Sequence, residues 1–249
     1  MLRQPRPLVP FTFPFLGQSY ARRILNTQSA SLIADWQLGE TSGTNAANAQ
    51  GTSARDGTYT NGVTLNAATF TDGTPAPSFD GTNDVINVYS SSLNSAFNNA
   101  QGTLFFWAQA SASGVWTDGA TRYFAILGAD ASNRVRIFKS SANNSVTWEY
   151  AAGGTAKART LATVSGTGWF SVALTWNKAG DQVIPYFNGS QAGTILTGLG
   201  TWTGSLASTT VDLGASNSSG ASPWSGFMKY AALWTTPLSA GEIAALSTV

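Results

Sequence analysis

The chain has 249 residues and a net charge of +1, with 10% of its residues charged and 43% hydrophobic. It contains no cysteine, which excludes a disulfide framework, a cysteine–zinc site and a thiol nucleophile, and no histidine, which removes the commonest general base and metal ligand. The near-neutral charge gives no general attraction to nucleic acid or to an anionic membrane, and no apolar stretch is long enough to predict a membrane span.

The first thirty residues differ in composition from the rest of the chain. Four of the nine prolines lie within the first fourteen positions, and residues 1–34 hold four arginines and no acidic residue. Because proline fixes φ and removes an amide donor, this pattern predicts an extended arm over residues 1–30. We expect the arm to dock on a protein partner, with aromatic anchors and ionic contacts from Phe11, Phe13, Phe15, Arg22 and Arg23.

Two other interpretations of the arm compete with docking. A secretory signal would account for the small residues of Ser19-Tyr20-Ala21, but the prolines interrupt its apolar run. A disordered tail would leave three phenylalanines in water. We therefore favour an arm held against its own domain or a neighbouring subunit.

From Ser31 onward the sequence predicts β-structure. The run Arg134-Val135-Arg136-Ile137 alternates in character, which is typical of a half-buried strand, and Asn188-Gly189 is a strong hairpin signal because both residues tolerate positive φ. Gly, Asn, Asp and Ser clusters separate runs rich in aromatic and β-branched residues. These runs are Ser31–Leu38, Val85–Tyr89, Thr103–Gln109, Tyr123–Leu127, Arg134–Phe138, Val146–Tyr150, Phe170–Trp176 and Val183–Phe187. About a dozen short strands indicate an all-β, two-sheet antiparallel sandwich over residues 31–249.

One helix is predicted, at the end of the chain. Ser239 and Glu242 have the spacing of a capping box, and Leu238, Ile243 and Leu246 form a small apolar face. We expect this short helix to close one end of the sandwich.

Several segments, taken in order, resemble a known family. They are Leu32–Gly43, Asp56–Tyr59, Ser78–Val85, Trp169–Trp176 with Tyr186–Gly189, and Gly226–Leu246. Their order resembles that of the laminin-G-like jelly rolls of the concanavalin A-like lectin/glucanase superfamily, across residues 31–249. The resemblance implies a jelly-roll sandwich, but the superfamily includes glycan-binding modules, adhesion domains, hydrolases and structural domains.

The acidic residues argue against an enzyme. Glycoside hydrolysis normally needs two carboxylates close together, and the hydrolases of this architecture place them along one strand. Here the three glutamates are scattered, while Asp80 and Asp84 flank a turn and are expected to bond its amides. We therefore predict no catalytic residues and no cofactor.

The resemblance also implies a calcium site built from acids in the opening loop and the last strand. The corresponding positions hold Glu40, Asn48 and Lys229. Because a lysine opposes a divalent cation and supplies a positive charge itself, we predict that the metal has been lost. A different site assembled from Asp56, Asp80 and Asp84 stays open as an alternative.

The nine tryptophans suggest carbohydrate binding, since sugars stack on exposed aromatic rings. Trp116, Trp202 and Trp224 lie in Gly/Ser/Thr-rich surroundings and are the candidates for exposed loop residues that form a glycan-binding platform; the alternative is that any one of them covers the core. The others lie in strand-like runs and are predicted to be core: Trp36, Trp107, Trp148, Trp169, Trp176 and Trp234.

Two functional hypotheses follow. The leading one is a non-enzymatic accessory protein that docks in many copies, or as a homo-oligomer, on a larger assembly through its arm. By architectural analogy we expect a virion, with this chain as a capsid decoration or tail-associated protein. The alternative is a free-standing carbohydrate-binding or cell-surface adhesion module that acts outside the cell.

Overall fold

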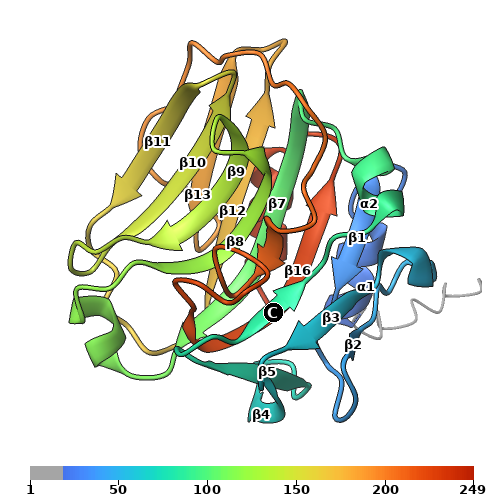
Figure 1. Cartoon of the computed structure of the whole chain (residues 1–249), viewed down its shortest axis with the longest axis vertical. Coiled ribbons are helices and arrows are strands. Elements are labelled where there is room, and N and C mark those ends of the chain that lie inside the picture. Colours follow the sequence, from blue (N-terminus) through green and yellow to red (C-terminus); the bar gives the residue numbers. More distant parts are fainter. Residues whose placement is uncertain (1–18) are drawn as a thin grey trace, which may run out of the picture.

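Two antiparallel sheets of eight strands each stack to form a sandwich (Figure 1). The computed structural model describes residues 19–249, so the predicted docking residues Phe11, Phe13 and Phe15 lie outside the described residues. The all-β fold predicted from the sequence is confirmed. No helix in residues 19–249 has both the length and the apolar character needed to cross a bilayer.

We call the two layers sheet A and sheet B. Sheet A runs in the order β14 (Ser190–Gln191), β13 (Gln182–Phe187), β12 (Phe170–Asn177), β7 (Gln101–Ala110), β16 (Ser225–Trp234), β5 (Pro75–Asp80) and β4 (Thr64–Thr69), and β1 (Leu32–Trp36) also pairs with β16. Sheet B runs in the order β11 (Thr155–Leu161), β10 (Val146–Ala152), β9 (Asn133–Lys139), β8 (Arg122–Asp130), β15 (Val211–Leu213), β6 (Val85–Asn87), β3 (Gly57–Thr60) and β2 (Asn45–Ala46). The helices are α1 (Tyr20–Asn26), α2 (Ser91–Ala96) and α3 (Ala240–Leu246), with 3₁₀ turns η1 (Ser53–Arg55) and η2 (Ser113–Thr117). All eight predicted strand runs form strands.

The hydrophobic pattern of each strand matches the cover on its two faces. In β9, buried and half-buried residues alternate, so one face packs into the main core between the sheets and the other does not. In β12, every residue except Asn177 is buried, because both faces of sheet A are covered at this strand.

Two local predictions are confirmed. Asn188 and Gly189 have φ of 48° and 78° and join β13 to β14, with Phe187 paired to Ser190. Ser239 and Glu242 form the expected capping box at the start of α3.

The structure corrects the prediction of an extended chain up to residue 30, because Tyr20–Asn26 form helix α1. Ser19 caps this helix by accepting a hydrogen bond from the Arg22 amide at 3.4 Å. No proline occurs between Pro14 and Pro75, so the reason given for an extended arm does not reach this segment. Tyr20 and Ile24 stand one turn apart and are both buried.

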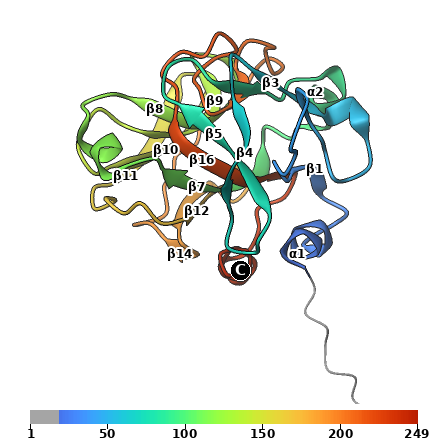
Figure 2. The ribbon, with the colours of Figure 1, turned by 90° about the horizontal axis from the view of Figure 1, so that it is seen from below.

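Helices α1 and α3 come from opposite ends of the described chain and lie side by side on the outer face of sheet A (Figure 2). Together they bury a second hydrophobic core that includes Tyr20, Ile24, Phe105, Trp107, Tyr230, Ile243 and Leu246. Helix α3 therefore covers a sheet face, whereas the sequence predicted that it closes one end of the sandwich.

Hydrogen bonds tie α1 to α3. The Tyr20 hydroxyl donates to the Leu246 carbonyl and accepts from the Trp107 indole at 2.6 Å. Arg23, predicted to dock on a partner, donates to the carbonyls of Ala245, at 3.0 Å, and Thr248. Arg22, the other predicted docking arginine, is exposed on α1.

Candidate functional site

The three tryptophans predicted to form an exposed platform are buried, so that prediction is wrong. Trp116 and Trp224 have no exposed surface, and Trp202 is 8% exposed. The Trp116 indole donates to the Gly166 carbonyl at 2.8 Å, and its ring centroid lies 5.8 Å from that of Trp224. The loops rich in small residues fold back over these indoles, which therefore fill the main core instead of meeting solvent.

Trp169 behaves in the opposite way. Of the nine tryptophans, all within residues 19–249, it alone is not buried, although the sequence placed it in the core. It borders a hollow of about 250 Å³ together with Thr163, Phe187 and Asn188. This hollow contains no charged side chain, and we call it the Trp169 hollow.

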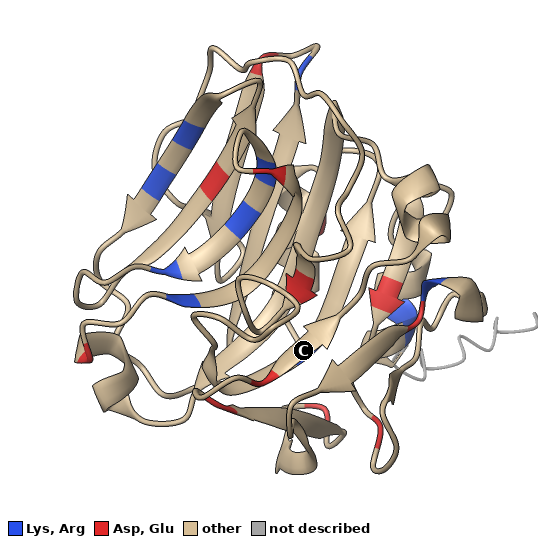
Figure 3. Ribbon diagram, viewed as in Figure 1, with Lys and Arg blue, Asp and Glu red and all other residues tan. Residues whose placement is uncertain are grey.

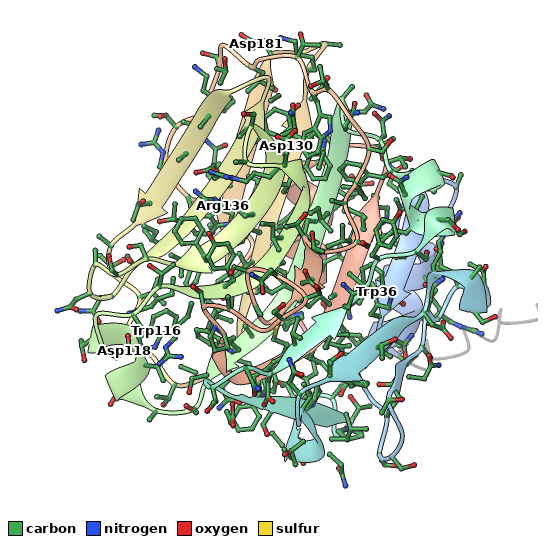
Figure 4. All side chains as sticks on the ribbon, viewed as in Figure 1. Trp36, Trp116, Asp118, Asp130, Arg136 and Asp181 are labelled. Carbon is green, nitrogen blue, oxygen red and sulfur yellow. The ribbon has the colours of Figure 1, made fainter. Side chains whose placement is uncertain are left out.

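A larger hollow, of about 390 Å³, lies on the outer face of sheet B, and we call it the sheet B hollow. Strands β8 and β9 contribute Tyr123, Ile126, Arg134 and Arg136. Figure 4 shows Arg136 on the broad face of the sheet, with Asp130 near it at the end of β8. The remaining lining residues are Ala129, Asp130, Ala131, Ala207, Thr209, Thr210 and Ser216.

Strand alternation places these side chains on one face. Val135 and Ile137 are buried in the main core, so Arg134, Arg136 and Phe138 project outward from β9. Phe138 pairs with Tyr123 on β8, and their rings stack with centroids 5.2 Å apart and planes inclined by 18°. The Arg136 guanidinium lies 4.8 Å from the centre of the Phe138 ring, a cation–π contact.

One carboxylate on β10 holds both arginines. Arg134 Nε lies 2.8 Å from Glu149 Oε1, and Arg136 Nη2 lies 2.7 Å from Glu149 Oε2. Although burial acts to raise it, the pKa of Glu149 is held below its usual value by the hydrogen bonds from these two guanidiniums. Figure 3 shows the two signs of charge on the neighbouring strands β9 and β10.

One wall of the hollow is a loop fixed to the sheet beneath it. The Gly128 amide donates to the Thr210 carbonyl at 2.8 Å, and the Gly128 carbonyl accepts from the Ala207 amide at 2.9 Å. The Asn87 side chain donates to Ser208 O at 3.1 Å and to Asp212 Oδ1 at 2.8 Å. Asp212 is fully buried, Oδ2 of its carboxylate has no partner among the described residues, and burial raises its pKa to about 7. The wall is therefore in place before any ligand arrives.

Asp80, Asp84 and Glu40 serve local structure. Asp80 accepts from the Thr82 amide at 2.7 Å and Asp84 accepts from the Asp80 amide at 2.8 Å, which confirms that this pair bonds its own turn. Glu40 accepts from the Ala47 amide at 2.8 Å and the Tyr59 hydroxyl at 2.7 Å. Glu149 and Glu242 are held by the arginine pair and the helix cap, so each glutamate is engaged in a different part of the molecule.

Lys229 lies where the family resemblance implies a cation. It is 1% exposed, and its Nζ donates to the carbonyls of Pro75 at 2.7 Å and Leu38 at 3.3 Å. Burial lowers its pKa to about 8. Within residues 19–249, Asp56, Asp80 and Asp84 do not come together in a group that could hold a metal ion.

Four residues around the sheet B hollow were not predicted as site residues from the sequence: Tyr123, Arg134, Arg136 and Phe138. The signal for the two arginines was the period-two alternation of residues 134–137, which predicted a half-buried strand. The same alternation places both guanidiniums on the exposed face. The missing information was which strand lies beside β9, and the structure supplies it as β8 and β10.

Comparison with known proteins agrees with the observed β-sandwich fold. A model of the concanavalin A-like lectin/glucanases superfamily matches residues 80–244, more than half of the chain. A search of curated proteins found no match.

Several solved structures are similar. Domain 4 of AbnA, an extracellular arabinanase from Geobacillus stearothermophilus in complex with arabinotriose, is 14% identical with a TM-score of 0.64, and the alignment covers 88% of this chain and 98% of that one. The sialidase CBM40 of Ruminococcus gnavus, bound to α2,3-sialyllactose, is 18% identical with a TM-score of 0.55, covering 70% of this chain and 96% of that one. The binding domain of botulinum neurotoxin serotype D is 15% identical with a TM-score of 0.61, and the alignment covers 87% of this chain but 51% of that domain. At these identities the likenesses establish the fold.

Proposed function

Because the chain belongs to the concanavalin A-like lectin/glucanases superfamily, we propose that it is a non-catalytic carbohydrate-binding domain that uses the sheet B hollow as its sugar site. One observation carries this proposal: the face of the sandwich that no described helix covers holds a preformed hollow lined by Tyr123, Arg134 and Arg136. Fixed hydrogen-bond donors on a partly apolar wall are the usual composition of a site that orients a polar ligand. Tyr123, at 8% exposed, belongs to the floor of the hollow and is not a stacking surface.

The comparisons support this proposal over the virion hypothesis. Two of the similar structures carry an arabinotriose and a sialyllactose in their descriptions, and a third is a toxin binding domain. None of them is described as a virion protein. An extracellular role fits the similar arabinanase domain, while docking of the N-terminal segment on an assembly and self-association stay predictions.

The arrangement of the carboxylates supports a binding role. The three glutamates are engaged separately, with the Tyr59 hydroxyl, the arginine pair and the α3 cap. A glycosidase needs one protonated and one ionised carboxylate on either side of a sugar bond. In the hollow, Asp130 instead accepts hydrogen bonds from its own turn, from Ser132 N at 2.7 Å and Asn133 Nδ2 at 3.1 Å.

Blocking the hollow tests the proposal. Thr209 is exposed and lines the hollow, so Thr209→Trp should fill it without disturbing the core. We expect the unmodified protein to bind on an oligosaccharide array, and Thr209→Trp to weaken the best ligand at least about tenfold by calorimetry, which is about 1.4 kcal/mol.

The matched control is Thr163→Trp, an exposed threonine that lines the Trp169 hollow. We expect this variant to bind like the unmodified protein. Absence of binding to any oligosaccharide would refute the proposed function. Loss of binding in Thr163→Trp but not in Thr209→Trp would move the site to the Trp169 hollow.

A further inference from the structure

We propose that the sugar held in the sheet B hollow carries a negatively charged group, a carboxylate or a sulfate, that binds Arg134. This inference rests on the proposed function and specifies its ligand class. Three features of the hollow support it: the position of the charged side chains, the unused donors of Arg134 and the rigidity of the guanidinium pair.

The charged side chains around the hollow balance in number but not in position. Both guanidiniums, Arg134 and Arg136, line the hollow, whereas the carboxylate that they share, Glu149, is not among its lining residues. The one acidic residue among the described lining residues, Asp130, keeps its negative charge, but its carboxylate accepts hydrogen bonds from Ser132 and Asn133 in its own turn.

Arg134 has donors to spare. Its Nε is used by Glu149, but its two terminal nitrogens donate to no side chain or carbonyl of residues 19–249. Arg134 lines the hollow, and its side chain keeps 22% of its surface exposed, against 9% for Glu149. A planar guanidinium with two free terminal groups matches the oxygens of a carboxylate or a sulfate.

Arg136 and its neighbours hold the pair in place. Arg136 donates to Glu149 and, through Nη1, to the Tyr123 hydroxyl at 2.5 Å, while the Phe138 ring supports its guanidinium. Its Nε is buried without a partner among the described residues. Because Arg136 fixes Glu149 and Glu149 fixes Arg134, an anion meets a preorganised donor and little side-chain entropy is lost on binding.

The probes are oligosaccharides in matched pairs that differ in charge alone: sialylated and desialylated, uronic acid and reduced, sulfated and unsulfated. We expect the charged member of at least one pair to bind about tenfold more tightly, as for a charge-assisted contact. The preference should shrink as salt is raised from about 0.05 to 0.5 M, since screening grows with ionic strength. The comparison of the carboxylated and sulfated pairs identifies the anion.

Variants of Arg134 test whether this residue causes the preference for the charged sugar. Arg134→Gln should bind both members of a pair equally, at the affinity of the neutral sugar, and Arg134→Lys should keep part of the preference because it keeps the charge. Arg22→Gln, the same change at an exposed arginine on α1, should leave the preference unaltered.

The inference is overturned if neutral sugars bind as well as charged ones, or if Arg134→Gln keeps the preference. In both cases the proposed function would stand, provided that Thr209→Trp still weakens binding at least about tenfold. If no oligosaccharide binds, the proposed function and this inference fail together.

Discussion

The outer faces of sheets A and B differ in what covers them. On sheet A, α1 and α3 bury aromatic side chains that include Phe105, Trp107 and Tyr230. On sheet B, the outer face carries the Arg134–Glu149–Arg136 row, and no helix of residues 19–249 lies over strands β8 and β9 (Figure 2). One face therefore stabilises the fold, and the other is available to a ligand.

The difference follows from strand sequence. Strand β7 is hydrophobic on both faces, with Leu104 and Phe106 in the core between the sheets and Phe105 and Trp107 in the core under the helices. Sheet A must therefore be covered twice, once by sheet B and once by the helices. In strand β9, buried and half-buried side chains alternate, so one face packs in the core and the other meets solvent. Substitutions on the covered face should change stability, and substitutions on the open face should change binding.

The largest expected effect on stability is at the centre of the covered face. Trp107 is 6% exposed, and Trp107→Ala should lower the free energy of unfolding by about 3–5 kcal/mol, as for other buried aromatic truncations. Denaturant unfolding measures this. Phe138→Ala, on the open face, is the matched comparison and should cost about 1 kcal/mol. Equal losses in the two variants would remove the distinction between the faces.

Trp116→Phe tests whether Trp116 stabilises the core or binds sugar. Because the indole is fully buried and donates to Gly166, we expect a loss of about 2 kcal/mol from the cavity and the missing hydrogen bond. Sugar affinity of the folded variant should be unchanged. A variant that unfolds normally but no longer binds sugar would restore the tryptophan platform predicted from the sequence.

Asp212→Asn tests the carboxylate under the wall of the hollow. Burial raises the folded-state pKa of Asp212 to about 7, above the unfolded value of about 3.9, so the native state binds the extra proton between these values. The contribution of Asp212 to stability should therefore fall as pH rises from about 4 to 7 and level off above that range. Asp212→Asn lacks this effect, and should be more stable than the unmodified protein by about 1–2 kcal/mol at pH 8 and equal to it near pH 4. If the two proteins differ in free energy of unfolding by the same amount at pH 4 and pH 8, the pKa of Asp212 is not raised in the folded state.

Tyr20→Phe should have the smallest effect. It keeps the ring contacts, including the edge-on contact with Tyr230 at 4.8 Å between centroids, but removes the hydroxyl that joins Trp107 to Leu246. We expect a loss of about 1 kcal/mol, or about 2–4 °C in Tm, for one hydrogen-bonded group on the covered face. Arg22→Ala, at an exposed position on the same helix, should not shift Tm. An equal shift in Arg22→Ala and Tyr20→Phe would contradict the claim that the hydrogen bonds of the Tyr20 hydroxyl cause the loss.

The sequence predicted the fold better than the site. Periodicity and turn residues act locally, so the strand runs, the Asn188-Gly189 hairpin and the Ser239–Glu242 cap could be read directly. Exposure of a side chain depends on what folds over it. Small-residue loops bury Trp116 and Trp224, and nothing in their local composition distinguishes a loop that covers an indole from one that presents it.

The same limit explains α1 and the arginine pair. Helix α1 is short and takes its stability from packing on sheet A, which a local pattern does not show. Arg134, Arg136 and Glu149 meet through the register of β9 and β10, in which Arg136 pairs with Glu149. That register is a long-range property, although the exposure of both arginines could be predicted from their alternation with Val135 and Ile137.

The most direct test of the account is an NMR titration of the isotope-labelled protein with the oligosaccharide that binds best on the array. We predict that the shifted amides cluster on β8, β9 and residues 203–210, around the sheet B hollow. Shifts that cluster on residues 163–169 and 187–188, or on α1 and α3, would contradict the claim that the open face of sheet B is the binding face.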